Sequence, residues 1–214
     1  MTVQVRLGQR VMRLAMCATV AGAALASQSS HAVVVAVDFS ANALSTVPFS
    51  IDGMYLNLVT GMATAAFSSG YDINPYFTGS TAPPAVFRLF TPPTTGGVVG
   101  NAASIATPLA IGTVVGAAST FNGGVSNATV ATPGINYFGL KFLNEATGVS
   151  NYGYLVVSQT AAVPVAGSVR ILGYAYENSG AAITVVPEPA TALMFGAALA
   201  AGVGRRFWQV RRQA

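Results

Sequence analysis

The sequence predicts an all-β domain, either a β-sandwich or a jelly-roll-like fold, flanked by an N-terminal signal peptide and a single C-terminal transmembrane helix. Three observations lead to this organisation. Short runs rich in Val, Ile, Leu, Phe and Tyr alternate with Gly and Pro breakers. No stretch between residues 33 and 186 has a long charged helical face, and each end of the chain combines arginines with an uncharged apolar run. We therefore divide the chain into residues 1–32, 33–186 and 187–214.

The first 32 residues show the parts of a secretory signal. An apolar run of 12 residues, Leu14–Leu25, has the length of a signal peptide's apolar segment and is short for the ~30 Å hydrocarbon core of a membrane. The positive segment before it contains Arg6, Arg10 and Arg13. Small residues at Ser30 and Ala32 predict cleavage by signal peptidase between Ala32 and Val33, with a cut after Ala26 as the alternative.

The middle segment contains six runs with the composition of β-strands. Val169–Tyr176 alternates most clearly, with Val169 and Ile171 predicted on one face and Tyr174 and Tyr176 on the other. Residues 91–133 carry no charge and remain open between a long loop and short strands such as Gly112–Val115. The six predicted strands are Val33–Phe39, Met54–Thr60, Ala85–Phe90, Tyr137–Leu143, Tyr152–Ser158 and Ser168–Tyr176.

The C-terminal segment has three parts in a fixed order. Pro187-Glu188-Pro189 comes first, and its two prolines keep the backbone extended. An uncharged run of 15 residues, Ala190–Gly204, follows and would form a helix of about 22 Å. An arginine cluster then acts as a membrane stop and, by the positive-inside rule, lies in the cytoplasm. The cluster consists of Arg205, Arg206, Arg211 and Arg212.

This order of Pro-Glu-Pro, apolar helix and arginine cluster resembles the PEP-CTERM sorting domain of Gram-negative bacteria. The resemblance covers about 28 of the 214 residues. It implies recognition by an exosortase, a membrane-embedded transpeptidase-like enzyme, and removal of the tail. It also implies an inner-membrane-anchored precursor that is then released to the cell surface or the extracellular matrix.

The charge of the chain belongs mostly to its ends. The whole sequence has a formal net charge of +4, but residues 33–186 have only three basic residues against five acidic ones. Nucleic-acid binding would need a basic patch on the folded domain, so the sequence predicts no nucleic-acid partner.

The residue inventory excludes several kinds of chemistry. After Ala32 the chain contains no His and no Cys, which excludes Ser-His-Asp and Cys-His catalysis and also histidine or thiolate metal sites. No Gly-rich phosphate loop follows a strand, and we expect no cofactor. The remaining carboxylates are expected to form turns or to solubilise the surface, with a calcium site at Asp72 and Asn74 as an alternative. These carboxylates are Asp38, Asp52, Asp72, Glu145 and Glu177.

The aromatic residues have two possible roles, packing in the core and stacking on a sugar ligand. We expect most of them to form the core of the fold, although exposed rings could stack on sugars. The leading hypothesis is a non-enzymatic surface or matrix protein with exopolysaccharide as a candidate partner. A carbohydrate-binding module is the alternative, and a glycosidase using two carboxylates is less expected. The aromatic residues considered are Tyr71, Tyr76, Phe77, Tyr137, Tyr152, Tyr154, Tyr174 and Tyr176.

Overall fold

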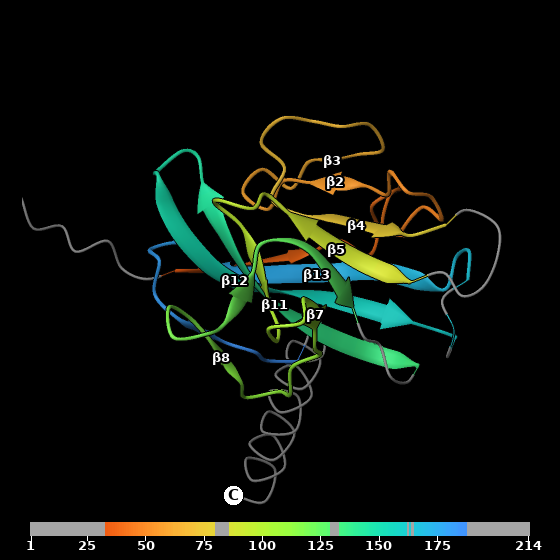
Figure 1. Cartoon of the computed structure of the whole chain (residues 1–214). Helices are drawn as coiled ribbons and strands as arrows, with labels where there is room; N and C mark the ends of the chain where they lie inside the picture. The colour runs from red at the N-terminus through yellow and green to blue at the C-terminus, as the bar shows by residue number, and fades with distance from the viewer. Residues whose placement is uncertain (1–32, 80–85, 129–132, 162, 164, 188–214) are drawn as a thin grey trace, which may run out of the picture. The chain divides into compact units, whose positions relative to one another are not determined.

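The computed structural model describes residues 33–79, 86–128, 133–161, 163 and 165–187. This part of the chain forms fourteen strands and no helix (Figure 1), which confirms the all-β prediction for the described residues. It accordingly contains no helix long and apolar enough to cross a membrane. The predicted signal peptide and transmembrane helix lie outside the described residues.

The larger sheet has six strands in the order β1-β13-β12-β11-β6-β9, and all neighbouring strands are antiparallel. Its centre is a meander of three long strands, at the positions where the sequence predicts strands near residues 140, 155 and 172. The strands of this sheet are β1 (Val34–Asp38), β6 (Gly97–Val99), β9 (Phe121–Asn122), β11 (Gly134–Asn144), β12 (Val149–Gln159) and β13 (Val169–Glu177).

The smaller sheet has four strands in the order β4-β5-β10-β7, and two further pairs form two-stranded sheets of their own. All of these strands have two to five residues. The four-stranded sheet consists of β4 (Asn74–Phe77), β5 (Phe87–Thr91), β7 (Ile105–Ala106) and β10 (Gly124–Ala128). The separate pairs are β2 (Tyr55–Leu56) with β3 (Ala63–Thr64), and β8 (Val114–Val115) with β14 (Ile183–Thr184).

The strand predicted at Met54–Thr60 is wrong for most of its length. Only Tyr55–Leu56 is a strand, because the chain turns directly after it. The Asn57 side-chain oxygen accepts hydrogen bonds from both the backbone N–H and the hydroxyl of Thr60, at 2.8 and 3.0 Å. Such a local bond from a side chain to the backbone competes with strand pairing. The predicted strands at Val33–Phe39 and Ala85–Phe90 correspond to β1 and β5.

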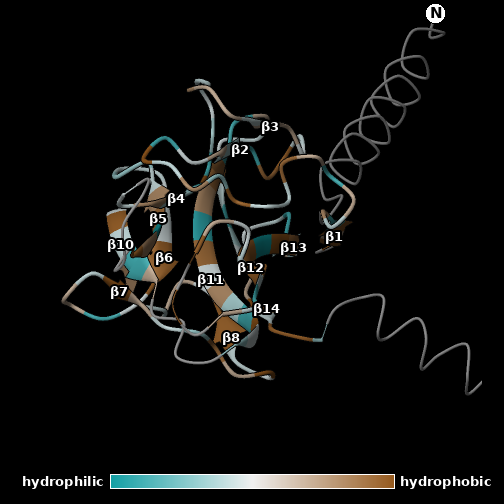
Figure 2. Ribbon diagram, turned by 90° about the vertical axis from the view of Figure 1, so that its right-hand side faces the viewer, coloured by the Kyte–Doolittle hydropathy of each residue, from teal (hydrophilic) through white to brown (hydrophobic). Residues whose placement is uncertain are grey.

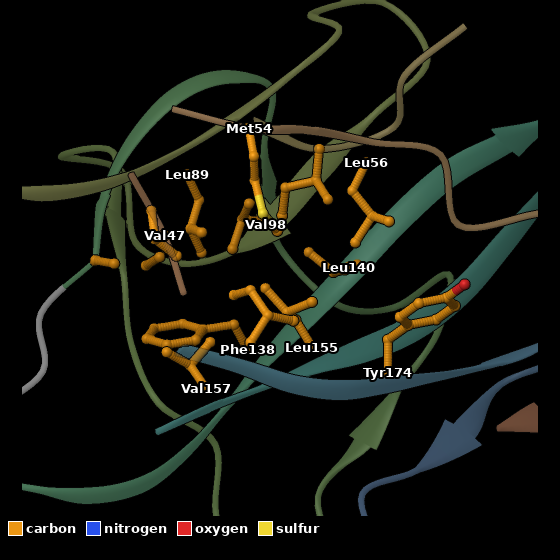
Figure 3. Close-up of a cluster of buried hydrophobic side chains, with 14 of the residues drawn as sticks. Val47, Met54, Leu56, Leu89, Val98, Phe138, Leu140, Leu155, Val157 and Tyr174 are labelled. Carbon is orange, nitrogen blue, oxygen red and sulfur yellow. The ribbon is translucent and has the colours of Figure 1, made fainter. Parts of the chain in front are cut away.

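The two sheets share one hydrophobic core. Leu89 of β5 lies across from Phe138 of β11 and Leu155 of β12, and all three side chains are fully buried (Figure 3). Met54 and Leu56 enter the same core from the segment around β2. Two sheets facing each other across a common core are consistent with the β-sandwich form of the prediction.

The opposite face of the six-stranded sheet is also covered. Tyr154, Val156 and Ala175 form a second buried cluster with Ile183 and Val185 near the end of the described chain. Residues 154–157 of β12 are therefore apolar without interruption, since alternate side chains serve the two clusters. Figure 2 shows hydrophobic and hydrophilic bands along β11, the neighbouring strand.

A β-bulge in β13 reverses the alternation that the sequence predicts. Val156 pairs with Gly173 and Val157 pairs with Ile171, which leaves Leu172 as an extra residue between them. Such an extra residue shifts every later side chain to the other face of the sheet. Tyr174 and Tyr176 consequently join Val169 and Ile171 in the large core, whereas the sequence predicts them on opposite faces.

Candidate functional site

The folded domain ends directly before the predicted sorting motif. Val185 is fully buried; its N–H donates to Thr113 O and its C=O accepts from Gly112 N–H, both at 2.8 Å. The Tyr154 hydroxyl lies 3.4 Å from Val186 O, although Val186 is 48% exposed. Pro187 comes next and is exposed, without a strand partner. Within the described residues, the last backbone hydrogen bonds to the rest of the fold are therefore made one or two residues before Pro187.

The remaining residues of the two processing sites lie outside the described part of the chain, so the predictions on them stay predictions. They are Ala32, Glu188, Pro189, Arg205, Arg206, Arg211 and Arg212. Val33, on the other side of the predicted signal cleavage, is described. Its N–H donates to the Asn178 side-chain oxygen and its C=O accepts from Asn178 N–H, each at 3.1 Å.

Two of the five carboxylates stabilise turns. Asp38 accepts a hydrogen bond from Ser40 N–H at 2.9 Å, and the bonds from Ser40 hold the pKa of this carboxyl below its ordinary value. Glu177, at the end of β13, accepts from Ser179 N–H and from Ala181 N–H, at 3.0 and 2.6 Å. Both residues are turn formers, as the sequence predicts.

Asp72 differs from the sequence prediction. Asp72 is one of the carboxylates that the sequence predicts to form turns, but Asn74–Phe77 directly after it forms β4, an edge strand where Pro75 needs no N–H donor. Asp72 is only 4% exposed, and it accepts a hydrogen bond of 2.7 Å from the distant Leu58 N–H rather than from its own turn. It therefore ties the β2–β3 segment to the start of β4.

The surroundings of Asp72 favour its protonated form. The pKa of Asp72 is raised from 3.8 to about 7 as the net result of three effects: burial raises it most, the hydrogen bond from Leu58 N–H lowers it in part, and the Glu145 carboxylate raises it. Glu145 itself is exposed and follows β11. The fold thus brings two carboxyl groups into electrostatic range, although they are 73 positions apart in the sequence.

The described residues offer little support for a metal centre. They contain no group of three or more His, Cys, Asp or Glu side chains that could hold a metal ion. In the calcium alternative, Asp72 already accepts from Leu58, and the Asn74 side-chain N–H donates to Asp52 O at 3.0 Å. The Asn74 side-chain oxygen is buried without a hydrogen-bond partner.

The aromatic residues divide into core and surface groups. Phe77, Tyr137, Tyr154, Tyr174 and Tyr176 are at most 8% exposed and belong to the two hydrophobic clusters, as the core interpretation predicts. Tyr71 and Tyr76 are half-buried, as is Tyr152, whose ring stacks on Phe121.

Tyr71 belongs to a surface cluster with Tyr55, Phe67 and Phe90. Phe67 meets Tyr55 and Tyr71 edge to face, with ring centroids 5.5 and 5.9 Å apart, and Tyr71 stacks on Phe90 at 6.2 Å. Phe67 is nevertheless 71% exposed. Neither Tyr55 nor Phe67 is among the aromatic residues that the sequence predicts as candidates. The available signal was a lone aromatic residue in a stretch of Ala, Ser, Thr and Gly between residues 63 and 70.

A groove of about 410 Å³ runs along this cluster. We call it the aromatic groove. Its apolar lining consists of Phe67, Tyr71, Pro92, Pro93 and Leu143, and its polar lining consists of Ser69, Gly70, Asp72, Thr95 and Glu145. A second hollow of about 200 Å³ is lined by Asn57, Thr60 and Met62 among others, and it shares Ser69 and Gly70 with the groove. Tyr71 lines both hollows.

Comparison with known families identifies the C-terminal part of the chain. A family model of the PEP-CTERM protein-sorting motif matches residues 185–212. The chain is therefore a PEP-CTERM domain-containing protein, and the resemblance stated from its sequence is confirmed. The motif indicates exosortase-dependent sorting of an exported protein with a membrane-anchored stage. No curated protein and no solved structure matches the chain.

Proposed function

We propose that the β-domain is a non-enzymatic protein of the cell surface or extracellular matrix of a Gram-negative bacterium. In this proposal a signal peptidase cuts between Ala32 and Val33, and an exosortase cuts near Pro187-Glu188-Pro189. The inner membrane holds the precursor between these two events, and exopolysaccharide is the candidate partner after release. No catalytic step is assigned to the domain.

One observation carries the sorting part of the proposal. The matched motif begins at Val185, the last buried residue of the described chain, and Pro187 follows on the exposed side of that junction. A membrane-embedded transpeptidase needs an unpaired backbone, and the prolines cannot donate to a sheet. In this proposal, cleavage at the junction therefore requires no unfolding of the two sheets.

The test is fractionation of cells that express the full chain, with detection by an antibody against the β-domain. In a host with exosortase, the wild-type domain is expected outside the inner membrane. The Glu188→Ala variant is expected to stay in the membrane as the longer precursor, because it lacks the single charge between the prolines. Asp52→Ala, which removes an exposed carboxylate of the folded domain, is the matched control and is expected to be released normally.

Two comparisons make the outcome decisive. Equal release from hosts with and without exosortase would show that another protease acts and would remove the basis of the proposal. Replacing the four arginines at 205, 206, 211 and 212 is expected to disturb retention or topology rather than cleavage, since arginine at the centre of a membrane costs about 2.5–3.5 kcal/mol.

A further inference from the structure

The most exposed aromatic ring of the surface cluster is not explained by the fold. Phe67 is 71% exposed and Met62, which lines the second hollow, is 65% exposed, yet neither belongs to the hydrophobic clusters. Large apolar side chains that gather in a hollow with polar edges are typical of a ligand site. The question is which ligand fits the lining.

The lining combines apolar surfaces with hydrogen-bonding groups at their edges. Phe67, Tyr71 and the two prolines offer flat apolar surfaces, while Ser69, Thr95 and Glu145 offer hydroxyl and carboxylate oxygens. A sugar ring has the complementary form, since its C–H faces are apolar and its hydroxyls project from the rim. Half-buried aromatic residues suit such ligands because their faces are apolar while a tyrosine hydroxyl stays polar.

The charge of the residues that line the groove favours a neutral sugar over an acidic one. Among the described residues that line the two hollows, none is Lys, Arg or His. Glu145 is exposed beside the groove, and a Cβ added to Gly70 would lie 3.6 Å from its Oε1, so the carboxylate reaches over the segment that carries Phe67 and Tyr71. An acidic sugar would meet an uncompensated negative charge there. A neutral sugar would find a hydrogen-bond acceptor.

We propose that the aromatic groove binds a neutral saccharide chain, with Phe67 and Tyr71 as stacking platforms and Glu145 as an acceptor for sugar hydroxyls. Tyr71 also lines the second hollow, so a saccharide chain that runs across Tyr71 would contact both hollows. Asp72 is buried and also lines the groove, and its hydrogen bond from Leu58 N–H holds the β2–β3 segment against the start of β4. The inference rests on the proposed function for the setting in which the saccharide is met.

The experiment is isothermal titration calorimetry on the purified full chain in lauryldimethylamine oxide, a detergent without a sugar headgroup. The probes are neutral hexasaccharides of glucose (β-1,4, α-1,4 and β-1,3), mannose, xylose and N-acetylglucosamine, with oligogalacturonate as the acidic comparison. Saturable binding is expected for at least one neutral probe and not for oligogalacturonate. Phe67→Ala and Tyr71→Ala are each expected to weaken binding about tenfold, since stacking on one ring is lost.

Two further variants separate the groove from general effects on the domain. Ile111→Ala removes an apolar side chain that is 59% exposed outside the groove, and it is expected to bind like the wild type. Glu145→Gln keeps an acceptor but removes the charge. This variant is expected to bind the neutral probe as the wild type does, and to bind oligogalacturonate more strongly than the wild type does.

Several results would overturn the proposal. These are no binding of any neutral probe, unchanged binding by Phe67→Ala, or stronger binding of oligogalacturonate by the wild type. A dimer that Phe67→Ala converts to a monomer in sedimentation equilibrium would show that a second copy covers the groove instead. None of these results depends on tail cleavage, so failure here is distinct from failure of the sorting test.

Discussion

The β-domain contains two regions that differ in how their backbone is fixed. In the meander of β11, β12 and β13, strands of 11, 11 and 9 residues pair along nearly their whole lengths. Between residues 46 and 128 the strands have two to five residues, and side chains complete the backbone bonding. Asn101, for example, accepts from the N–H groups of Ala103 and Ile105 at 3.0 and 3.3 Å.

This difference shows where a binding surface can form on such a domain. The long strands of the meander bury most of their side chains in two clusters, which favours stability, and the hollow of about 270 Å³ over β1, β12 and β13 contains no exposed aromatic side chain among its described lining residues. The short-strand region exposes its turns, and there Phe67 and Tyr71 line the aromatic groove. Loops on a rigid support commonly carry recognition. We therefore expect substitutions in the meander to affect folding and substitutions in the groove to affect binding.

The largest expected effect concerns Phe138 at the centre of β11. Its ring is fully buried between the two sheets (Figure 3), so Phe138→Ala should lower the free energy of unfolding by about 3–5 kcal/mol. Phe67→Ala makes the same chemical change at a side chain that is 71% exposed, and its effect should stay within about 0.5 kcal/mol. Urea unfolding followed by circular dichroism measures both. Similar losses in the two variants would contradict the division of the domain.

The same division explains which elements could be predicted from the sequence. β11 and β12 follow from continuous runs of strand-forming residues, because strand composition and burial are local properties there. The sorting motif was also predictable, since Pro187, Glu188 and Pro189 are adjacent in the sequence and the motif is recognised from the order of residues alone.

The predictions that failed concern residues whose position or role depends on partners far away in the sequence. The reversal of faces in β13 comes from one extra residue, Leu172, which is recognisable only from the register with β12. The role of Asp72 depends on the backbone of Leu58, 14 positions earlier. The aromatic groove joins Phe67 to Glu145, and no local pattern links two loops so far apart in the chain.

The second prediction concerns the pH dependence of stability that the buried carboxyl group of Asp72 gives to the short-strand region. The pKa of Asp72 is raised to about 7 in the fold from an ordinary 3.8, so the unfolded chain releases its proton first as pH rises. Stability is then fully present below pH 3.8 and decreases up to about pH 7, with a total contribution of about 2–4 kcal/mol.

Asp72→Asn should remove this pH dependence, because the amide oxygen can still accept from Leu58 N–H without carrying a charge. Between pH 4 and pH 8 the wild type should lose about 2–4 kcal/mol more than the variant in urea unfolding. Asp52→Asn, at an exposed turn, is the control and should follow the wild type. Parallel curves for wild type and Asp72→Asn would show that burial does not shift this group.

The smallest expected effect lies at the end of the meander, where β13 ends and the chain turns towards β14 and the sorting motif. The Glu177 carboxylate is 2% exposed and accepts from Ser179 N–H, Ser179 Oγ–H and Ala181 N–H. Glu177→Gln keeps one acceptor and directs an N–H donor at these donors, so it should lower stability by about 1–2 kcal/mol. Ser179→Ala removes only the hydroxyl and should cost about half as much.

Hydrogen exchange distinguishes a local from a global effect: in Glu177→Gln the amides of Ser179 and Ala181 should exchange faster, while that of Leu155 in the meander should change less. If Leu155 loses protection equally, the turn belongs to the cooperative unit of the meander, and the segment leading to Pro187 is held by the whole domain rather than by its last turn.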